Sequence, residues 1–131
     1  MVLAKDTANR YLVYRFGTKD KIDFTFPDKI GNPDEAKQSR NKFKYSFYIR
    51  GGEKQNEGLD LNYVYFSNGK FKYVIYQTYS ANESESRCGI KIIDLATKKT
   101  IDIKGKIESI RRDLKDLRDS SLLEIGDELF D

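Results

Sequence analysis

The sequence lacks histidine and tryptophan, and its 131 residues include one cysteine and two prolines. Without histidine, neither a Ser-His-Asp nor a Cys-His nucleophile system can form, and a histidine-ligated zinc site is equally impossible. The single cysteine, Cys88, permits neither a disulfide within the chain nor a four-thiolate metal site. We therefore expect no catalytic residues, no metal site and no cofactor.

Carboxylates are the main remaining candidates for general acid–base chemistry. No spacing among them selects two residues as a glycosidase-type acid and base. We therefore expect the protein not to be an enzyme. The candidate carboxylates are Asp20, Asp23, Glu53, Glu57, Asp60, Glu83 and Glu85.

Charge and hydropathy limit the partners and the compartment. The net charge of +3 is too small to imply a polyanionic partner, although residues 106–131, with five basic and eight acidic groups, are more acidic than the rest. No stretch of about 18 apolar residues occurs, so we expect no insertion into a membrane. The first residues contain no hydrophobic signal core. The chain is then either a cytoplasmic protein or the trimmed mature form of a periplasmic or secreted one.

Aromatic residues with strand-like alternation dominate the first two thirds of the chain. We expect turns at residues 17–20 and at Asn68-Gly69, where a type I′ turn would need positive φ at both central residues. A polar loop with a short helical turn is expected over residues 27–42, and a mobile acidic loop over residues 80–87. The expected strands are residues 11–16, 21–26, 43–50, 59–66, 71–79, 90–95 and 100–104.

The apolar period changes after residue 105. Ile107, Ile110, Leu114 and Leu117 are spaced by three and four residues, which predicts a helix from about residue 106 to 119. The apolar residues after residue 121 indicate that the tail docks. The sequence therefore predicts one α+β domain over residues 1–131. Its β-rich body, about residues 10–104, is an antiparallel sheet of six to seven strands, and its helical C-terminal segment, about residues 106–131, packs on that sheet.

A polar, glycine-bearing loop at residues 51–58 is the first candidate site. Arg50 precedes it, and Asp60 and Asn62 follow it. The segment is either a binding loop or a long hairpin connection whose Asp60 and Asn62 satisfy the local backbone. Under the first interpretation, the predicted partner-binding residues are Tyr48, Arg50, Glu53, Lys54, Asn56, Asp60 and Asn62.

The nine tyrosines form a second candidate. Three interpretations of them are open. They form cross-strand pairs that cover a core, they are anchors of a protein interface, or they form a stacking surface for single-stranded nucleic acid. Tyr48 and Tyr76 with neighbouring lysines would carry the last of these.

The sequence contains the motifs Tyr14-Arg15-Phe16-Gly17, Arg50-Gly51-Gly52 and Gly58-Leu59-Asp60-Leu61-Asn62. They resemble motifs of a family of small uncharacterised bacterial β-rich proteins, many of them secreted. The resemblance covers about residues 10–105 and implies no known activity. In general character the chain also resembles bacterial immunity proteins and enzyme inhibitors.

The sequence leads to a hypothesis of a non-catalytic protein that occludes a partner protein, such as a toxin or a hydrolase. One alternative is a single-stranded nucleic-acid-binding module that uses an aromatic and basic sheet face. The other is a small exported protein with an unknown ligand.

Overall fold

The computed structural model describes residues 2–5, 12–17, 20–27, 42–51, 58–81, 83–110, 113–120 and 122–130. The chain contacts divide it into two compact units. One comprises Met1–Phe43 with Ser121–Glu124, and the other comprises Lys44–Ser120 with Ile125–Asp131.

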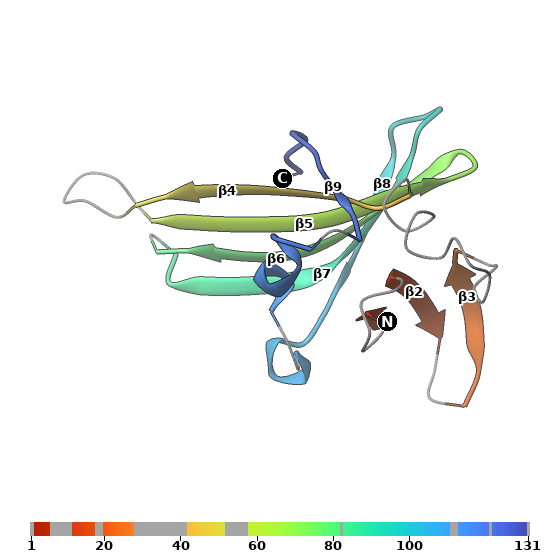
Figure 1. Ribbon diagram of the computed structural model, residues 1–131, viewed down its shortest axis with the longest axis horizontal. Coiled ribbons are helices and arrows are strands. Elements are labelled where there is room, and N and C mark those ends of the chain that lie inside the picture. Colours follow the sequence, from red (N-terminus) through yellow and green to blue (C-terminus); the bar gives the residue numbers. More distant parts are fainter. Residues whose placement is uncertain are drawn as a thin grey trace. The chain divides into compact units, whose positions relative to one another are not determined.

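The first unit contains a three-stranded antiparallel sheet in the order β1-β2-β3 (Figure 1). Its strands are β1 (Val2–Lys5), β2 (Leu12–Gly17) and β3 (Ile22–Phe26). The β2–β3 hairpin confirms the expected strands at residues 11–16 and 21–26, whereas β1 was not expected, because its four residues are too few to show alternation. Phe26 packs edge-on against Phe43 at 5.6 Å between ring centres. The predicted helical turn at residues 34–37 lies outside the described residues.

The second unit is built on a six-stranded sheet in the order β8-β7-β6-β5-β4-β9 (Figure 1). Successive antiparallel hairpins join β4 to β8, and β9 makes the sheet mixed. The strands are β4 (Lys44–Arg50), β5 (Leu59–Asn68), β6 (Phe71–Ser80), β7 (Glu85–Asp94), β8 (Thr100–Lys104) and β9 (Glu124–Ile125).

Neighbouring residues of a strand point to opposite faces of a sheet. Because apolar residues occupy neighbouring positions in these strands, both faces of this sheet bury apolar side chains. Val64, Ile75 and Ile90 lie in one cross-strand row and are buried on the first face. The opposite face buries a cluster of aromatic and aliphatic residues, against which Phe130 of the tail packs. That cluster is Tyr63, Tyr65, Val74 and Tyr76.

Two turns differ in detail from the prediction. The β5–β6 turn is where Asn68-Gly69 indicates, but Asn68 still pairs with Phe71, so Gly69 and Lys70 are the central residues. Gly69 has a φ of 61°, and Lys70 does not share its positive φ. In the expected loop at 80–87, residues 85–87 belong to β7, because Arg87 pairs with Thr78 of β6. The turn is therefore confined to residues 81–84.

The predicted α+β fold class is wrong, because the described chain is all-β and contains no helix of seven or more residues. The expected helix at 106–119 is two short 3₁₀ helices, η1 (Ile107–Ser109) and η2 (Leu114–Leu117). Ile110 and Asp113 between them have extended backbone, with ψ of 125° and 140°.

Tertiary contacts explain this difference. A helix of this length is marginal without packing along its whole apolar face. Only Leu114 and Leu117 of the four spaced apolar residues are buried, while Ile107 and Ile110 remain exposed. The backbone N–H of Leu114 donates to Gln77 Oε1 of β6 at 2.8 Å, which replaces a helical hydrogen bond with a bond to the sheet.

Candidate functional site

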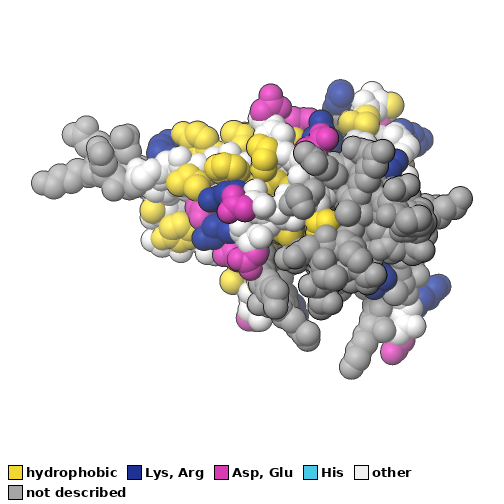
Figure 2. All heavy atoms as spheres, viewed as in Figure 1, with side chains coloured by type: hydrophobic (Ala, Val, Ile, Leu, Met, Phe, Trp, Pro, Cys, Tyr) yellow, Lys and Arg dark blue, Asp and Glu magenta, His cyan; other side chains and the backbone are white. Residues whose placement is uncertain are grey.

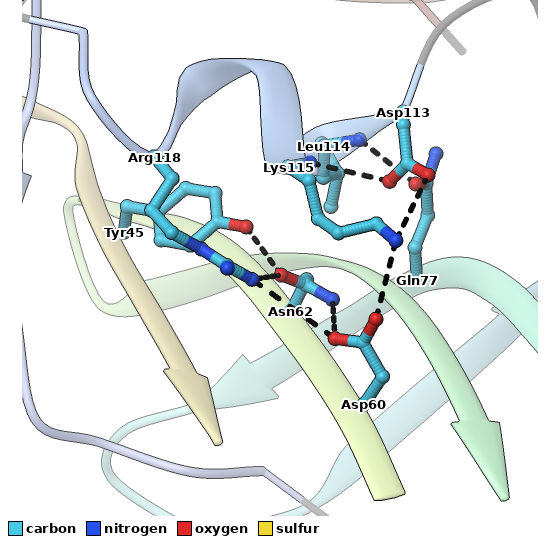
Figure 3. A network of polar contacts seen from close by, with 8 residues as sticks. All are labelled: Tyr45, Asp60, Asn62, Gln77, Asp113, Leu114, Lys115 and Arg118. Atoms are coloured by element: carbon cyan, nitrogen blue, oxygen red, sulfur yellow. Dashed lines mark hydrogen bonds and ion pairs between the residues drawn. The ribbon is translucent and has the colours of Figure 1, made fainter. Parts of the chain in front are cut away.

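A polar network lies on the first face of the sheet, beneath η2 (Figure 3). The strand period places Asp60 and Asn62 of β5 on this face. The register places Phe47 and Ile49 of β4 beside Asn62 and Asp60, respectively. On the other side of β5, Gln77 and Tyr79 of β6 lie opposite Asn62 and Asp60. These three strands thus form the floor of the network.

The 3₁₀ helix η2 and the residue after it bring two cations over this floor. Lys115 Nζ lies 3.3 Å from Asp60 Oδ2 and 3.6 Å from Asp113 Oδ2. Arg118 Nη2 donates to Asn62 Oδ1 at 2.9 Å and lies 4.0 Å from Asp60 Oδ1. Asp113 also caps η2 by accepting from the backbone N–H of Lys115. The short helix is therefore tied to the sheet by charge as well as by its buried leucines.

Asn62 is the centre of the network and is buried, with 2% of its surface exposed. Its Oδ1 accepts from Arg118 and from the Tyr45 hydroxyl, and its Nδ2 donates to Asp60 Oδ1 at 2.7 Å. A buried amide with these partners is satisfied on both its oxygen and its nitrogen. Asn62 therefore holds the charged residues in place and does not itself present a contact surface.

Burial and charge shift two pKa values in this network. The hydrogen bond from Lys115 to Asp60, helped by Asp113, raises the pKa of Lys115. Burial raises the pKa of Tyr45 from 10.0 to about 12, although Arg118 opposes the shift. At neutral pH the lysine is therefore a cation and Tyr45 a neutral hydrogen-bond donor.

Apolar side chains surround this polar centre. Phe47, Ile49 and Tyr79 are 40%, 54% and 44% exposed, and the exposed Ile107 and Ile110 lie near Asp60 and Tyr79. Figure 2 shows hydrophobic side chains gathered over β4 and its neighbouring strands around a few charged ones. We call this set, Phe47, Ile49, Tyr79, Ile107 and Ile110 with Asp60, Lys115 and Arg118, the η2 surface.

A concavity of about 490 Å³ adjoins one part of the η2 surface. Its lining includes Asp60, Tyr79, Ile107, Ile110 and Lys115. The volume falls within the usual range for ligand-binding sites. Its charged groups are already paired with one another, so the arrangement suits recognition of a partner's polar groups better than proton transfer.

The structure separates the residues that the sequence grouped into one partner-binding site. Tyr48 and Arg50 pair with Leu61 and Leu59, so they lie on the face opposite to Asp60 and Asn62. Both Tyr48 and Arg50 are exposed there. The other predicted contacts, Glu53, Lys54 and Asn56, lie outside the described residues.

Sequence reasoning missed the exposed part of β4. Residues 43, 45, 47 and 49 alternate as one apolar face, but only Phe43 and Tyr45 are buried, while Phe47 and Ile49 are exposed. Ser46, on the other face of β4, is also buried, and its hydroxyl donates to the Glu128 carbonyl of the tail. Lys115 and Arg118 were missed because the segment was expected to be one helix with its charged residues on the face away from the sheet. The one sequence signal for Lys115 and Arg118 was that charges of both signs alternate with the apolar residues of this segment.

The carboxylates weighed for catalysis are dispersed. Asp20 and Asp23 lie in the first unit, whereas Glu83 and Glu85 form exposed ion pairs with Arg87 at 3.0 and 2.9 Å. Glu53 and Glu57 lie outside the described residues. Among the described residues, no three histidine, cysteine, aspartate or glutamate side chains are grouped so as to hold a metal ion. No helix among them has the length and apolar character needed to cross a membrane.

Most described tyrosines are buried, including Tyr76, whose hydroxyl donates to Asp102 Oδ1 at 2.7 Å. The exposed Tyr48 and Tyr79 lie on opposite faces of the sheet. This arrangement does not favour a continuous stacking surface for nucleic-acid bases, which needs several exposed rings on one face. The buried tyrosines are Tyr14, Tyr45, Tyr63, Tyr65 and Tyr76.

Comparison of this chain with protein-family models, with curated proteins and with solved structures finds no match.

Proposed function

We propose that this chain is a non-catalytic binding protein that occludes a partner protein, such as a toxin or a hydrolase, through the η2 surface. The observation that carries the proposal is the ring of exposed apolar side chains around a preformed ion-pair network. Scattered apolar residues are ordinary on a protein surface, whereas a grouped set rimming polar anchors is typical of interfaces.

The polar centre is already ordered before any partner arrives. Arg118 lies 4.2 Å above the centre of the Phe47 ring and is held by Asn62, so it needs little reorganisation to contact a partner. Preformed anchors reduce the entropy lost on association. Arginine and tyrosine are also among the residues that most often dominate interface energies. Arg118 and Tyr79 are therefore the expected anchors.

Lys115 supplies a charge that a partner can use. Its side chain is 46% exposed although it pairs with Asp60 and Asp113. A carboxylate on the partner can approach this cation without removing it from its existing contacts. The network then acts as a fixed polar patch that orients the partner, while the surrounding apolar side chains exclude water.

The experiment is affinity capture from a lysate of the source organism, with and without nuclease treatment. The wild-type chain is compared with Ile49→Ser combined with Tyr79→Ser, and with Ile101→Ser as the matched control. Ile101 is an isoleucine of β8 that is 63% exposed and does not belong to the η2 surface. We expect one nuclease-insensitive protein that the double variant loses and the control retains.

Purified partner then tests occlusion directly. We expect the wild-type chain to inhibit its activity, and each of Ile49→Ser and Tyr79→Ser to weaken binding by about 1–3 kcal/mol. If Tyr48→Ala and Arg50→Ala weaken binding and the η2 variants do not, the interface is the opposite face. A set of captured proteins that disappears after nuclease treatment would contradict the proposal and favour nucleic-acid binding.

A further inference from the structure

The outer edge of β4 is only partly covered by β9. The carbonyls of Phe43 and Tyr45 accept from the backbone N–H groups of Glu124 and Gly126 at 3.2 and 2.7 Å. Backbone groups of a strand point to alternate sides with a period of two. The N–H and C=O groups of Phe47 and Ile49 therefore point to the same outer edge.

The tail leaves this edge after Gly126 and crosses the face of the sheet. The Glu128 carbonyl accepts from Ser46, and the Phe130 ring packs edge-on against Tyr65 at 5.1 Å between ring centres. Within the described part of the chain, β9 ends at Ile125 and no further strand lies beyond β4 in the sheet. Phe47 and Ile49 thus offer four backbone groups at an edge without a neighbouring described strand.

Charge indicates what such an edge accepts. Residues 42–50 contain Lys42, Lys44 and Arg50 and no carboxylate. The residues that cover the first part of the edge, 124–126, contain one carboxylate, Glu124, and no cation, and Asp127 and Glu128 follow where the tail leaves the edge. A second copy of β4 would instead place one basic strand against another, which like-charge pairing disfavours. The chain itself therefore pairs a basic edge strand with a short segment whose one charged residue is acidic.

We propose that the free half of this edge, at Phe47 and Ile49, accepts an extended acidic segment of the partner protein as an added strand. The inference rests on the proposed function and names the part of the partner that would be recognised. Main-chain hydrogen bonds supply affinity in this mode of recognition, and alternate side chains supply specificity. Apolar residues of the added strand would lie beside Phe47 and Ile49, and its acidic residues beside Tyr48 and Arg50 on the other face.

The probe is a fluorescent, end-blocked peptide of eight residues that alternates glutamate with valine. Its controls are a peptide that alternates lysine with valine and one with four glutamates followed by four valines. We expect the alternating acidic peptide to bind to the full chain at least about tenfold more tightly than either control. Equal binding of the three peptides, or no binding of the acidic one, would overturn the proposal.

The variant Ile49→Pro isolates the contribution of the edge. Proline removes the outward N–H of residue 49 and leaves the β4–β5 hydrogen bonds in place, since residues 48 and 50 make those. Ile49→Ala keeps the N–H and is the matched control. We expect Ile49→Pro to bind the acidic peptide at least about tenfold more weakly than Ile49→Ala. Equal affinities of the two variants would contradict strand addition.

Amide hydrogen exchange in the wild-type chain provides a second readout that needs no variant. The peptide should slow exchange at Phe47 and Ile49 and leave Ile101 unchanged, and unaltered exchange at the first two would overturn the proposal. Failure here is distinct from failure of the proposed function. Suppose that Tyr79→Ser loses a captured partner, whereas Ile49→Pro and Ile49→Ala bind it equally. This result would support the η2 surface as the interface and contradict strand addition.

Discussion

The guanidinium of Arg118 lies 4.2 Å above the centre of the Phe47 ring and donates to the buried Asn62 at 2.9 Å. Phe47 lies in the middle of β4, whereas Arg118 directly follows η2, so this contact joins segments that are far apart in the sequence. It combines a cation–π interaction with a charge-assisted hydrogen bond. Together with the buried Leu114 and Leu117, this pair holds η2 on the sheet.

Arg118→Ala should destabilise the protein by about 1–3 kcal/mol, because it removes the hydrogen bond to buried Asn62 and the contact with Phe47. Chemical denaturation measures the change. Arg87→Ala is the matched control, since Arg87 forms ion pairs with exposed Glu83 and Glu85, and such surface ion pairs contribute little. Equal losses in the two variants would show that Arg118 does not hold η2 on the sheet.

Stability should fall at high pH through Tyr45. Its pKa is raised from 10.0 to about 12 by burial, so the folded state favours the neutral phenol. The stabilisation is complete below pH 10 and is lost as the pH rises towards 12, with a magnitude on the order of 2 kcal/mol. Unfolding free energies measured between pH 8 and 12 test this. Tyr45→Phe, which cannot ionise, should show a smaller decline, and an identical decline would refute the assignment.

Gly89→Ala should destabilise the protein by about 1–3 kcal/mol through overpacking. A Cβ at residue 89 would lie 2.5 Å from the Ile103 carbonyl oxygen of β8 and 2.7 Å from the Tyr76 hydroxyl of β6. Gly51→Ala is the control, because nothing lies within 4 Å of its Cβ position. Thermal unfolding of both variants distinguishes the crowded site from the open one, and a Gly89→Ala protein as stable as Gly51→Ala would disprove the close approach.

Because residues 107–117 form two 3₁₀ helices, we expect alanine substitutions along this segment to destabilise the protein by unequal amounts. Leu117→Ala should cost about 2–4 kcal/mol, because Leu117 is buried, whereas Ile107→Ala should cost less than about 1 kcal/mol, because Ile107 is exposed. One continuous amphipathic helix would make the two costs similar. The denaturation midpoints of the two variants decide between the two arrangements, provided that the slope of the unfolding free energy with denaturant concentration is unchanged.

The sequence alone determined most of the strands. Alternating aromatic and β-branched residues located β2 to β6 and β8 to within a few residues, and Asn68-Gly69 located the β5–β6 turn, because these signals depend on local backbone preferences. It also ruled out histidine-dependent chemistry. It did not reveal β1, the extension of β7 to Glu85 or the two-residue β9, since short or polar strands carry no periodic signal.

Tertiary structure alone decided the candidate site. Alternation shows which residues of one strand share a face, but not which face of the next strand they join. Only the register places Asp60 beside Ile49 and separates it from Tyr48 and Arg50. Likewise, the spacing of Ile107, Ile110, Leu114 and Leu117 is compatible with one face of a helix. The bond from the Leu114 N–H to Gln77 of the sheet replaces a helical hydrogen bond, and the Arg118 side chain binds Asn62, so that two short 3₁₀ helices form in place of one helix.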